Sequence, residues 1–160
     1  MSVTSQINVI APGMKILFAY KGRYQIRDTT TIEYLSSLAK KFGCHTDLVY
    51  DQDTFGVTDN VLSVPFLNKM FSKDQAVVDS IIKKDPQMVV FLDGFTQGPW
   101  NRDISKAVKE INKDISCVGL FHCDSASLYD EYDYVLIGEP ESSFKKFFND
   151  KIFNGDKGGL

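Results

Sequence analysis

Short apolar runs alternate along this chain with longer segments in which apolar positions recur every three or four residues. The runs predict strands over 15–20, 44–50, 87–92, 115–121 and 134–137. The periodic segments predict helices from Thr30 to Gly43, over 74–84, over 100–112 and over 141–149. In the first helix, Thr30 and Glu33 suggest a capping box and Gly43 a C-terminal stop. Strands that alternate with amphipathic helices predict a parallel sheet with helices on both faces.

Five strands joined by right-handed crossover helices predict a doubly wound sheet of order 2-1-3-4-5, the flavodoxin-like and Rossmann-like winding. The alternating pattern of 44–50 suits an edge strand. We expect one domain over 14–150, after a loose N-terminal extension (1–13) and before a linker or frayed tail (151–160). Residues 51–73 are too long for a simple connection and predict an insertion, which either packs under a loop or docks another domain.

Composition narrows the class of protein. The 160 residues are 43% hydrophobic and 24% charged, which is typical of a globular domain. A net charge of -3 argues against a nucleic-acid partner, and no apolar run is long enough to span a bilayer. Three cysteines without a secretion signal favour a reducing compartment, so we expect a cytoplasmic protein.

Candidate functional residues follow the strands, because ligands of parallel sheets bind at the carboxyl ends, where strand order reverses. They are Lys21, Gly22, Arg23 and Tyr24 after the first strand; Asp93, Gly94, Phe95, Thr96 and Trp100 after the third; Gly119 and His122 at the fourth; and Gly138 and Glu139 after the fifth. Lys21 and Arg23 suit an anionic group, although a solvated basic turn fits equally well. Phe95 and Trp100 suit the wall of a ligand site.

Common catalytic signatures are absent from the sequence. It contains no P-loop, no G-x-G-x-x-G fingerprint, no nucleophile elbow and none of the paired acids of a response regulator. Adjacent His122, Cys123 and Asp124 invite a metal site, but neighbouring residues on extended chain point in opposite directions. We therefore expect no metal ligands and no catalytic residues in this chain.

Four motifs together resemble one family. They are Asp85-Pro86 leading into the third strand, Ala107-Val108-Lys109-Glu110-Ile111, Gly119-Leu120-Phe121-His122, and Asp133-Tyr134-Val135 with Gly138-Glu139-Pro140-Glu141. In this order they resemble the N-terminal cobalamin-binding-type domain of B12-binding radical SAM proteins, over roughly 14–148. The last motif, similar to the family's D-Y-V-x-x-G-E-G-E, is the most specific.

The resemblance implies a module that holds a corrinoid over the carboxyl ends of the strands, with Gly94, Gly119 and Gly138 admitting the cofactor. The cluster motif CxxxCxxC is absent, so the chain carries no iron-sulfur cluster and would not be catalytic alone. Its expected partner is a radical SAM domain outside this chain, within a B12-dependent radical SAM enzyme.

Two alternatives stay open. The loop after the first strand lacks the cobalt-binding D-x-H-x-x-G motif, and Leu120 and Pro140 replace glycines of the family. These departures favour a degenerate scaffold or interaction domain of the same fold, which would support a partner domain through 55–71. The opening Met14-Lys15-Ile16-Leu17-Phe18 also suits the N-terminal half of a glycosyltransferase.

Overall fold

The computed structural model describes residues 10–22, 26–52, 74–92, 98–121 and 131–153. The elements are β1 (Lys15–Gly22), α1 (Ile26–Lys41), β2 (His45–Gln52), α3 (Asp74–Lys84), β3 (Met88–Leu92), α4 (Gly98–Ile111), β4 (Ser116–Phe121), β5 (Tyr134–Ile137) and α5 (Pro140–Phe153). The five strands pair in parallel in the order β2-β1-β3-β4-β5. The predicted flavodoxin-like topology is confirmed, with β2 at an edge.

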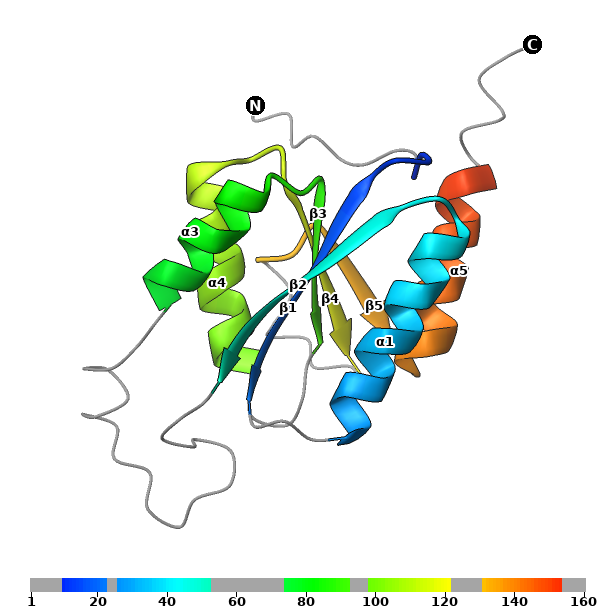
Figure 1. Ribbon diagram of the computed structural model, residues 1–160, viewed down its shortest axis with the longest axis horizontal. Helices are drawn as coiled ribbons and strands as arrows, with labels where there is room; N and C mark the ends of the chain where they lie inside the picture. The colour runs from blue at the N-terminus through cyan, green and yellow to red at the C-terminus, as the bar shows by residue number, and fades with distance from the viewer. Residues whose placement is uncertain (1–9, 23–25, 53–73, 93–97, 122–130, 154–160) are drawn as a thin grey trace.

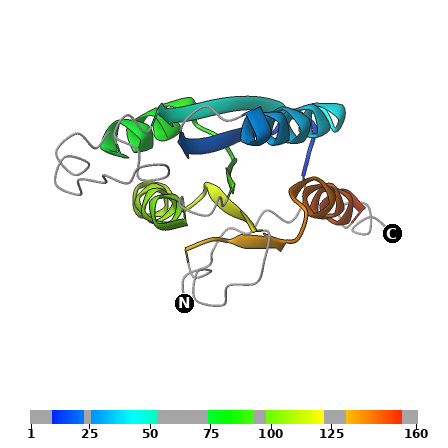
Figure 2. The same cartoon turned by 90° about the horizontal axis from the view of Figure 1, so that it is seen from below.

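Helices cover both faces of the sheet. α1 and α5 pack side by side on one face, and α3 and α4 pack together on the other (Figures 1 and 2). All five strand arrows in Figure 1 point to the same edge of the sheet, which we call the carboxyl edge. We call the opposite edge the amino edge.

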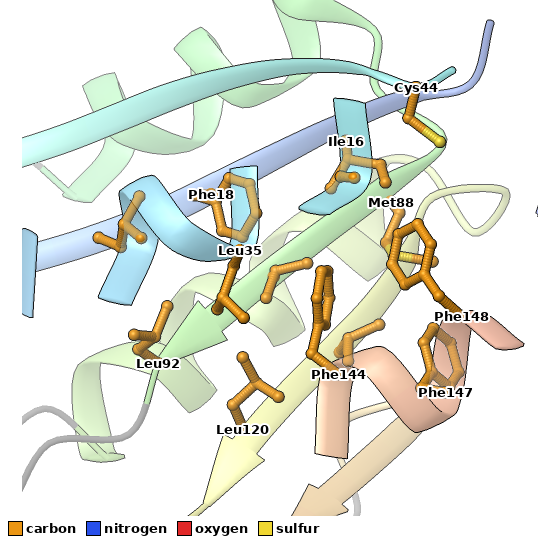
Figure 3. Close-up of a cluster of buried hydrophobic side chains, with 14 of the residues drawn as sticks. Ile16, Phe18, Leu35, Cys44, Met88, Leu92, Leu120, Phe144, Phe147 and Phe148 are labelled. Carbon is orange, nitrogen blue, oxygen red and sulfur yellow. The ribbon is translucent and has the colours of Figure 1, made fainter. Parts of the chain in front are cut away.

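The sheet separates two apolar cores. One lies under α1 and α5 and includes Phe18, Leu35, Leu120 and Phe144, as Figure 3 shows. The other lies under α3 and α4 and includes Val89, Ile104 and Cys117 among its buried residues. Every side chain of β3 is buried, as expected of a central parallel strand with helices on both faces.

Several predicted boundaries shift. α1 begins at Ile26, so Thr30 lies inside the helix and the predicted capping box is wrong. Asp51 and Gln52, expected in the insertion, pair with the end of β1 and complete β2. The start of α1 and the end of β2 both extend beyond their predicted bounds. The hydrogen bonds of a helix and of a parallel strand pair join backbone groups, so they form whether or not the side chains are apolar. The remaining insertion, 53–73, lies outside the described residues.

The two ends of the domain also contribute to the fold. Ile10, in the expected N-terminal extension, is buried in the core under α1 and α5, and Gly13 N–H donates to the carbonyl of Gly43 (2.8 Å). α5 runs on to Phe153, into the segment expected as a tail. The described parts of both segments are therefore continuous with the domain.

An ion pair closes the amino edge between α4 and β5. The Lys109 ammonium lies 2.9 Å from both carboxylate oxygens of Asp133, whose side chain is only 5% exposed. Asp133 also accepts from the backbone N–H of Cys117 (2.8 Å), and Lys109 donates to the Ile115 carbonyl (3.2 Å). Two motifs of the family resemblance thus meet at this edge and hold the last strand against the sheet.

Candidate functional site

The carboxyl edge has a point of divergence between β1 and β3. The chain leaves β1 towards α1 on one face and leaves β3 towards α4 on the other. In doubly wound sheets a crevice for ligands opens where consecutive connections leave in opposite directions. The candidate site is therefore built from the last residues of the strands and the first turns of the helices around this point (Figure 1).

A charged cluster occupies the α3 and α4 side of this edge. The Lys21 ammonium lies 3.3 Å from a carboxylate oxygen of Asp51 and 3.5 Å from one of Asp74. It also lies 5.6 Å from the ring centroid of Trp100, whose indole N–H donates to Asp74 (2.9 Å). We call these four residues the Lys21 cluster.

The Lys21 cluster changes two of the predicted roles. Its two carboxylates and one ammonium leave one net negative charge, so Lys21 does not present a free cation to an anionic ligand. Trp100 is buried and its N–H is already bonded, so it braces α4 against α3 rather than exposing a ring face. Lys21 and Trp100 both lie at the candidate site, where they hold neighbouring elements in place.

The first turn of α4 holds a buried amide at the end of β3. Asn101 is 1% exposed, and its Nδ2 donates to the carbonyl of Leu92, the last residue of β3 (2.8 Å). Within the described part of the chain, its Oδ1 has no hydrogen-bond partner. A buried acceptor without a donor costs about 1–3 kcal/mol, so this atom can accept a hydrogen bond from a water or from a donor group of a ligand. The next residue, Arg102, has a buried Nε that also lacks a partner there.

Gly119 does not offer the open approach that the sequence predicted. A Cβ built on it would lie 2.5 Å from Phe121 Cε2 and 3.2 Å from Tyr132 Cγ. The two rings meet edge to face, with centroids 5.6 Å apart. The space left by the missing side chain is therefore filled by the protein's own aromatic residues.

Leu120 lies elsewhere than expected. Its side chain is 1% exposed and sits in the core under α1 and α5, between Leu92 and Phe144 in Figure 3. It points into the protein interior from the face opposite Gly119, because side chains alternate along a strand. Leu120 therefore fills the core, and its side chain does not reach the carboxyl edge.

Gly138 and Glu139 remain open at the end of β5. Gly138 has a φ of +115°, and a Cβ built on it would meet nothing within 4 Å. Its N–H is taken by the Phe121 carbonyl (2.8 Å), so any backbone contact to a ligand must use another group. Glu139 is exposed, and α5 begins at Pro140, one residue before the predicted start.

The other predicted residues divide into two groups. Gly22 ends β1, and its carbonyl accepts the Tyr50 hydroxyl (2.5 Å), which fixes this end of the strand. The rest lie outside the described residues: Arg23, Tyr24, Asp93, Gly94, Phe95, Thr96 and His122. The structure thus brings Lys21, Gly22 and Trp100 to the carboxyl edge with Gly138 and Glu139, and shows Gly119 closed.

Sequence reasoning missed three residues of this edge: Asp51, Asp74 and Asn101. Asp51 begins the predicted insertion and Asp74 directly follows it, and no local pattern joins either residue to Lys21. The sequence could have revealed Asn101, because this amide residue falls on the same side of α4 as Ile104 and Ser105, which are also buried. A polar residue on a buried helical stripe is a candidate for a buried hydrogen bond.

A separate hollow lies at the amino edge. It has a volume of about 250 Å³ and is lined by residues of β1, β2 and the end of α3, among them Leu17, Asp47 and Lys84. Asp47 and Lys84 form an ion pair at its rim, which lowers the pKa of the Asp47 carboxyl. Because this hollow lies at the opposite edge, it has no part in the candidate site.

Metal and membrane chemistry find no support in the residues that the structure describes. They bring together no group of three His, Cys, Asp or Glu side chains suited to a metal ion. Over the same ranges, each helix is too short or too polar to cross a bilayer. Cys44 and Cys117 are free and buried, and burial raises the pKa of both thiols.

Comparison with known proteins assigns the chain to no family. No protein-family model and no curated protein matches the chain. It is similar to the structure of a 3-dehydroquinate dehydratase-like protein from Bifidobacterium longum, with 17% identity and a TM-score of 0.48 over 89% of this chain and 98% of that one. A pilus assembly protein, CpaE, from Burkholderia thailandensis shows 10% identity and a TM-score of 0.45 over 86% and 97%. The chain is a flavodoxin-like α/β domain on the strength of its own strand order, and no family is assigned.

Proposed function

We propose that this chain is a cobalamin-binding-type domain of a B12-dependent radical SAM enzyme, holding a corrinoid at the carboxyl edge of its sheet. The observation that carries the proposal is the divergence of α1 and α4 at the ends of β1 and β3, which is where such folds bind ligands. The motif resemblance supplies the kind of ligand. When bound, the corrinoid would contribute its cobalt chemistry, while this domain orients it towards a partner domain.

The described residues fit a corrinoid in two respects. A corrin ring carries neutral amide side chains, and Asn101 Oδ1 is a buried acceptor without a donor beside the point of divergence. Gly138 leaves open space at the end of β5. In one respect the fit differs from the expected one, because the position of Gly119 is closed by aromatic rings.

A spectrophotometric titration with hydroxocobalamin tests the proposal. We expect a saturable change in the visible spectrum, weakened by Glu139→Trp, which places a large side chain at the exposed end of β5. Glu110→Trp is the matched control, since Glu110 is also exposed but lies near the amino edge, at the end of α4. Equal weakening by both variants, or no saturable change in the parent chain, would contradict binding at this edge.

A second candidate function is a scaffold of the same fold that binds no cofactor and supports a partner domain. Two observations favour it: the closed position of Gly119, and the neutralisation of Lys21 by two carboxylates. A folded domain whose addition leaves the hydroxocobalamin spectrum unchanged would select this function over the first.

A further inference from the structure

The buried amide of Asn101 limits the chemistry of the group that can sit beside it. Its Nδ2 is committed to the Leu92 carbonyl at 2.8 Å, so the side chain cannot turn over to offer its N–H₂ group instead. What remains is the carbonyl oxygen Oδ1, without a donor among the described residues. Only a hydrogen-bond donor can satisfy this atom, and an anion would be repelled by its lone pairs.

The charge nearby points the same way. The Lys21 cluster, which includes the residue directly before Asn101, carries two carboxylates against one ammonium. An anionic group would therefore gain little from Lys21. Arg102 offers a cation with a buried unpartnered Nε, which an anion could satisfy, but an anion leaves Asn101 Oδ1 unpaired. A cationic donor would be repelled by Arg102, whereas a neutral N–H donor satisfies Asn101 and opposes neither Arg102 nor the cluster.

We infer that Asn101 is a specificity residue that accepts a hydrogen bond from one neutral amide side chain of the corrin ring. This inference rests on the proposed function and adds the orientation of the ligand. The amide-bearing rim of the ring faces the start of α4, and the phosphate of the nucleotide tail lies away from Asn101. Lys21, Asp74 and Trp100 act as positioning residues, because they fix the start of α4 against α3.

The test uses corrinoids that differ at one group. In each monocarboxylic acid isomer of cobalamin, one amide is hydrolysed to a carboxylate, which removes the donor and adds a negative charge. We expect one isomer to bind the full chain at least about tenfold more weakly than cobalamin, as is typical when a hydrogen bond with a buried group is lost. Cobinamide, which lacks the nucleotide tail, should retain most of the affinity.

Asn101→Leu, of similar volume but without the acceptor, should bind cobalamin more weakly and should no longer distinguish that isomer from cobalamin. Ser105→Ala is the matched control, because Ser105 lies one turn further along α4 and loses a comparable buried hydrogen bond, to the Glu131 carbonyl (2.6 Å). It should keep the isomer discrimination. Circular dichroism checks folding, and Asn101→Ala, which also removes the acceptor, serves if the leucine variant does not fold.

The outcomes separate the two proposals. Binding of cobalamin without isomer discrimination, or with discrimination that persists in Asn101→Leu, overturns the role of Asn101 and leaves the proposed function standing. Loss of binding by cobinamide together with equal binding of all isomers assigns this edge to the phosphate instead. A parent chain that binds no corrinoid overturns both.

Discussion

Removal of the Asp133 carboxylate should lower the free energy of unfolding of this domain more than removal of an exposed charge does. Asp133→Ala breaks the two 2.9 Å contacts with Lys109 and the 2.8 Å bond from the Cys117 N–H. The Asp133 side chain is 5% exposed and that of Lys109 is 22% exposed, so the ammonium is left partly desolvated without its counterion. Removing one partner of a buried ion pair costs about 3–5 kcal/mol. We expect about 3 kcal/mol here, because Lys109 retains some solvent and its carbonyl partners.

Urea denaturation followed by far-ultraviolet circular dichroism measures this change. For a slope of about 1–3 kcal/mol per molar urea, the midpoint should fall by about 1 M or more. Lys109→Met should have a similar effect, and the double variant should lose less than the sum of the two single variants, because both remove the same interaction. Asp47→Ala provides the control. It breaks an ion pair whose side chains are 37% and 56% exposed, so it should cost less than about 1 kcal/mol.

The reasoning would be refuted by a loss below about 1 kcal/mol for Asp133→Ala, or by additive losses in the double variant. Either result would mean that the ion pair contributes no more than a surface pair. The closure of the amino edge would then depend on apolar packing around Tyr134 and Phe147 instead, whose ring centroids lie 5.2 Å apart.

Three further predictions concern single residues. Burial raises the pKa of Cys117 to about 11 from a usual 9.0, so its protonated thiol stabilises the fold below pH 9 and this contribution is lost as the pH rises towards 11. The thermal midpoint should fall more steeply over that range than in Cys117→Ala, and parallel curves would contradict this. Gly119→Ala should lower the free energy of unfolding in urea by about 2 kcal/mol, because the new Cβ would lie 2.5 Å from Phe121. Gly138→Ala should lower it by about 1 kcal/mol, because its new side chain meets only backbone strain. The reverse order would contradict the packing described around Gly119. Trp100→Phe should cost about 1 kcal/mol in the same assay by removing the indole N–H bond to half-exposed Asp74, and an unchanged midpoint would show that this bond adds nothing.

The fold could be predicted from the sequence because its information is periodic. Buried strands such as 87–92 and helical stripes such as 74–84 each leave a pattern in neighbouring residues, and the crossover rule then restricts the strand order. The start of α1 was missed because its first turn precedes the apolar stripe, so hydrophobic spacing carries no mark of it. The end of β2 was missed for the same reason, since Asp51 and Gln52 pair through their backbone.

The candidate site was less predictable because its contacts join distant residues. Lys21 and Asp74 are 53 positions apart, and only the parallel packing of β1 with β2 and α3 brings them together. The sequence suggested that Lys21 is a free cation, whereas in the structure the carboxylates of Asp51 and Asp74 neutralise its charge. Gly119 likewise suggested open space beside the strand. Whether that space is open depends on the positions of the Phe121 and Tyr132 rings, which the sequence does not specify.

The motifs that carry the family resemblance divide between the two edges of the sheet, and this decides how the function must be tested. Lys109 and Asp133 belong to the amino edge, where they hold β5 to the sheet. Gly138 and Glu139 follow β5 at the carboxyl edge. A side chain at Gly138 would meet open space, and Glu139 is exposed. A variant at Asp133 destabilises the domain, so weaker binding by it would not distinguish a lost ligand contact from partial unfolding. Once the parent chain binds a corrinoid, variants at the carboxyl edge that leave the urea midpoint unchanged are the ones that locate the site there.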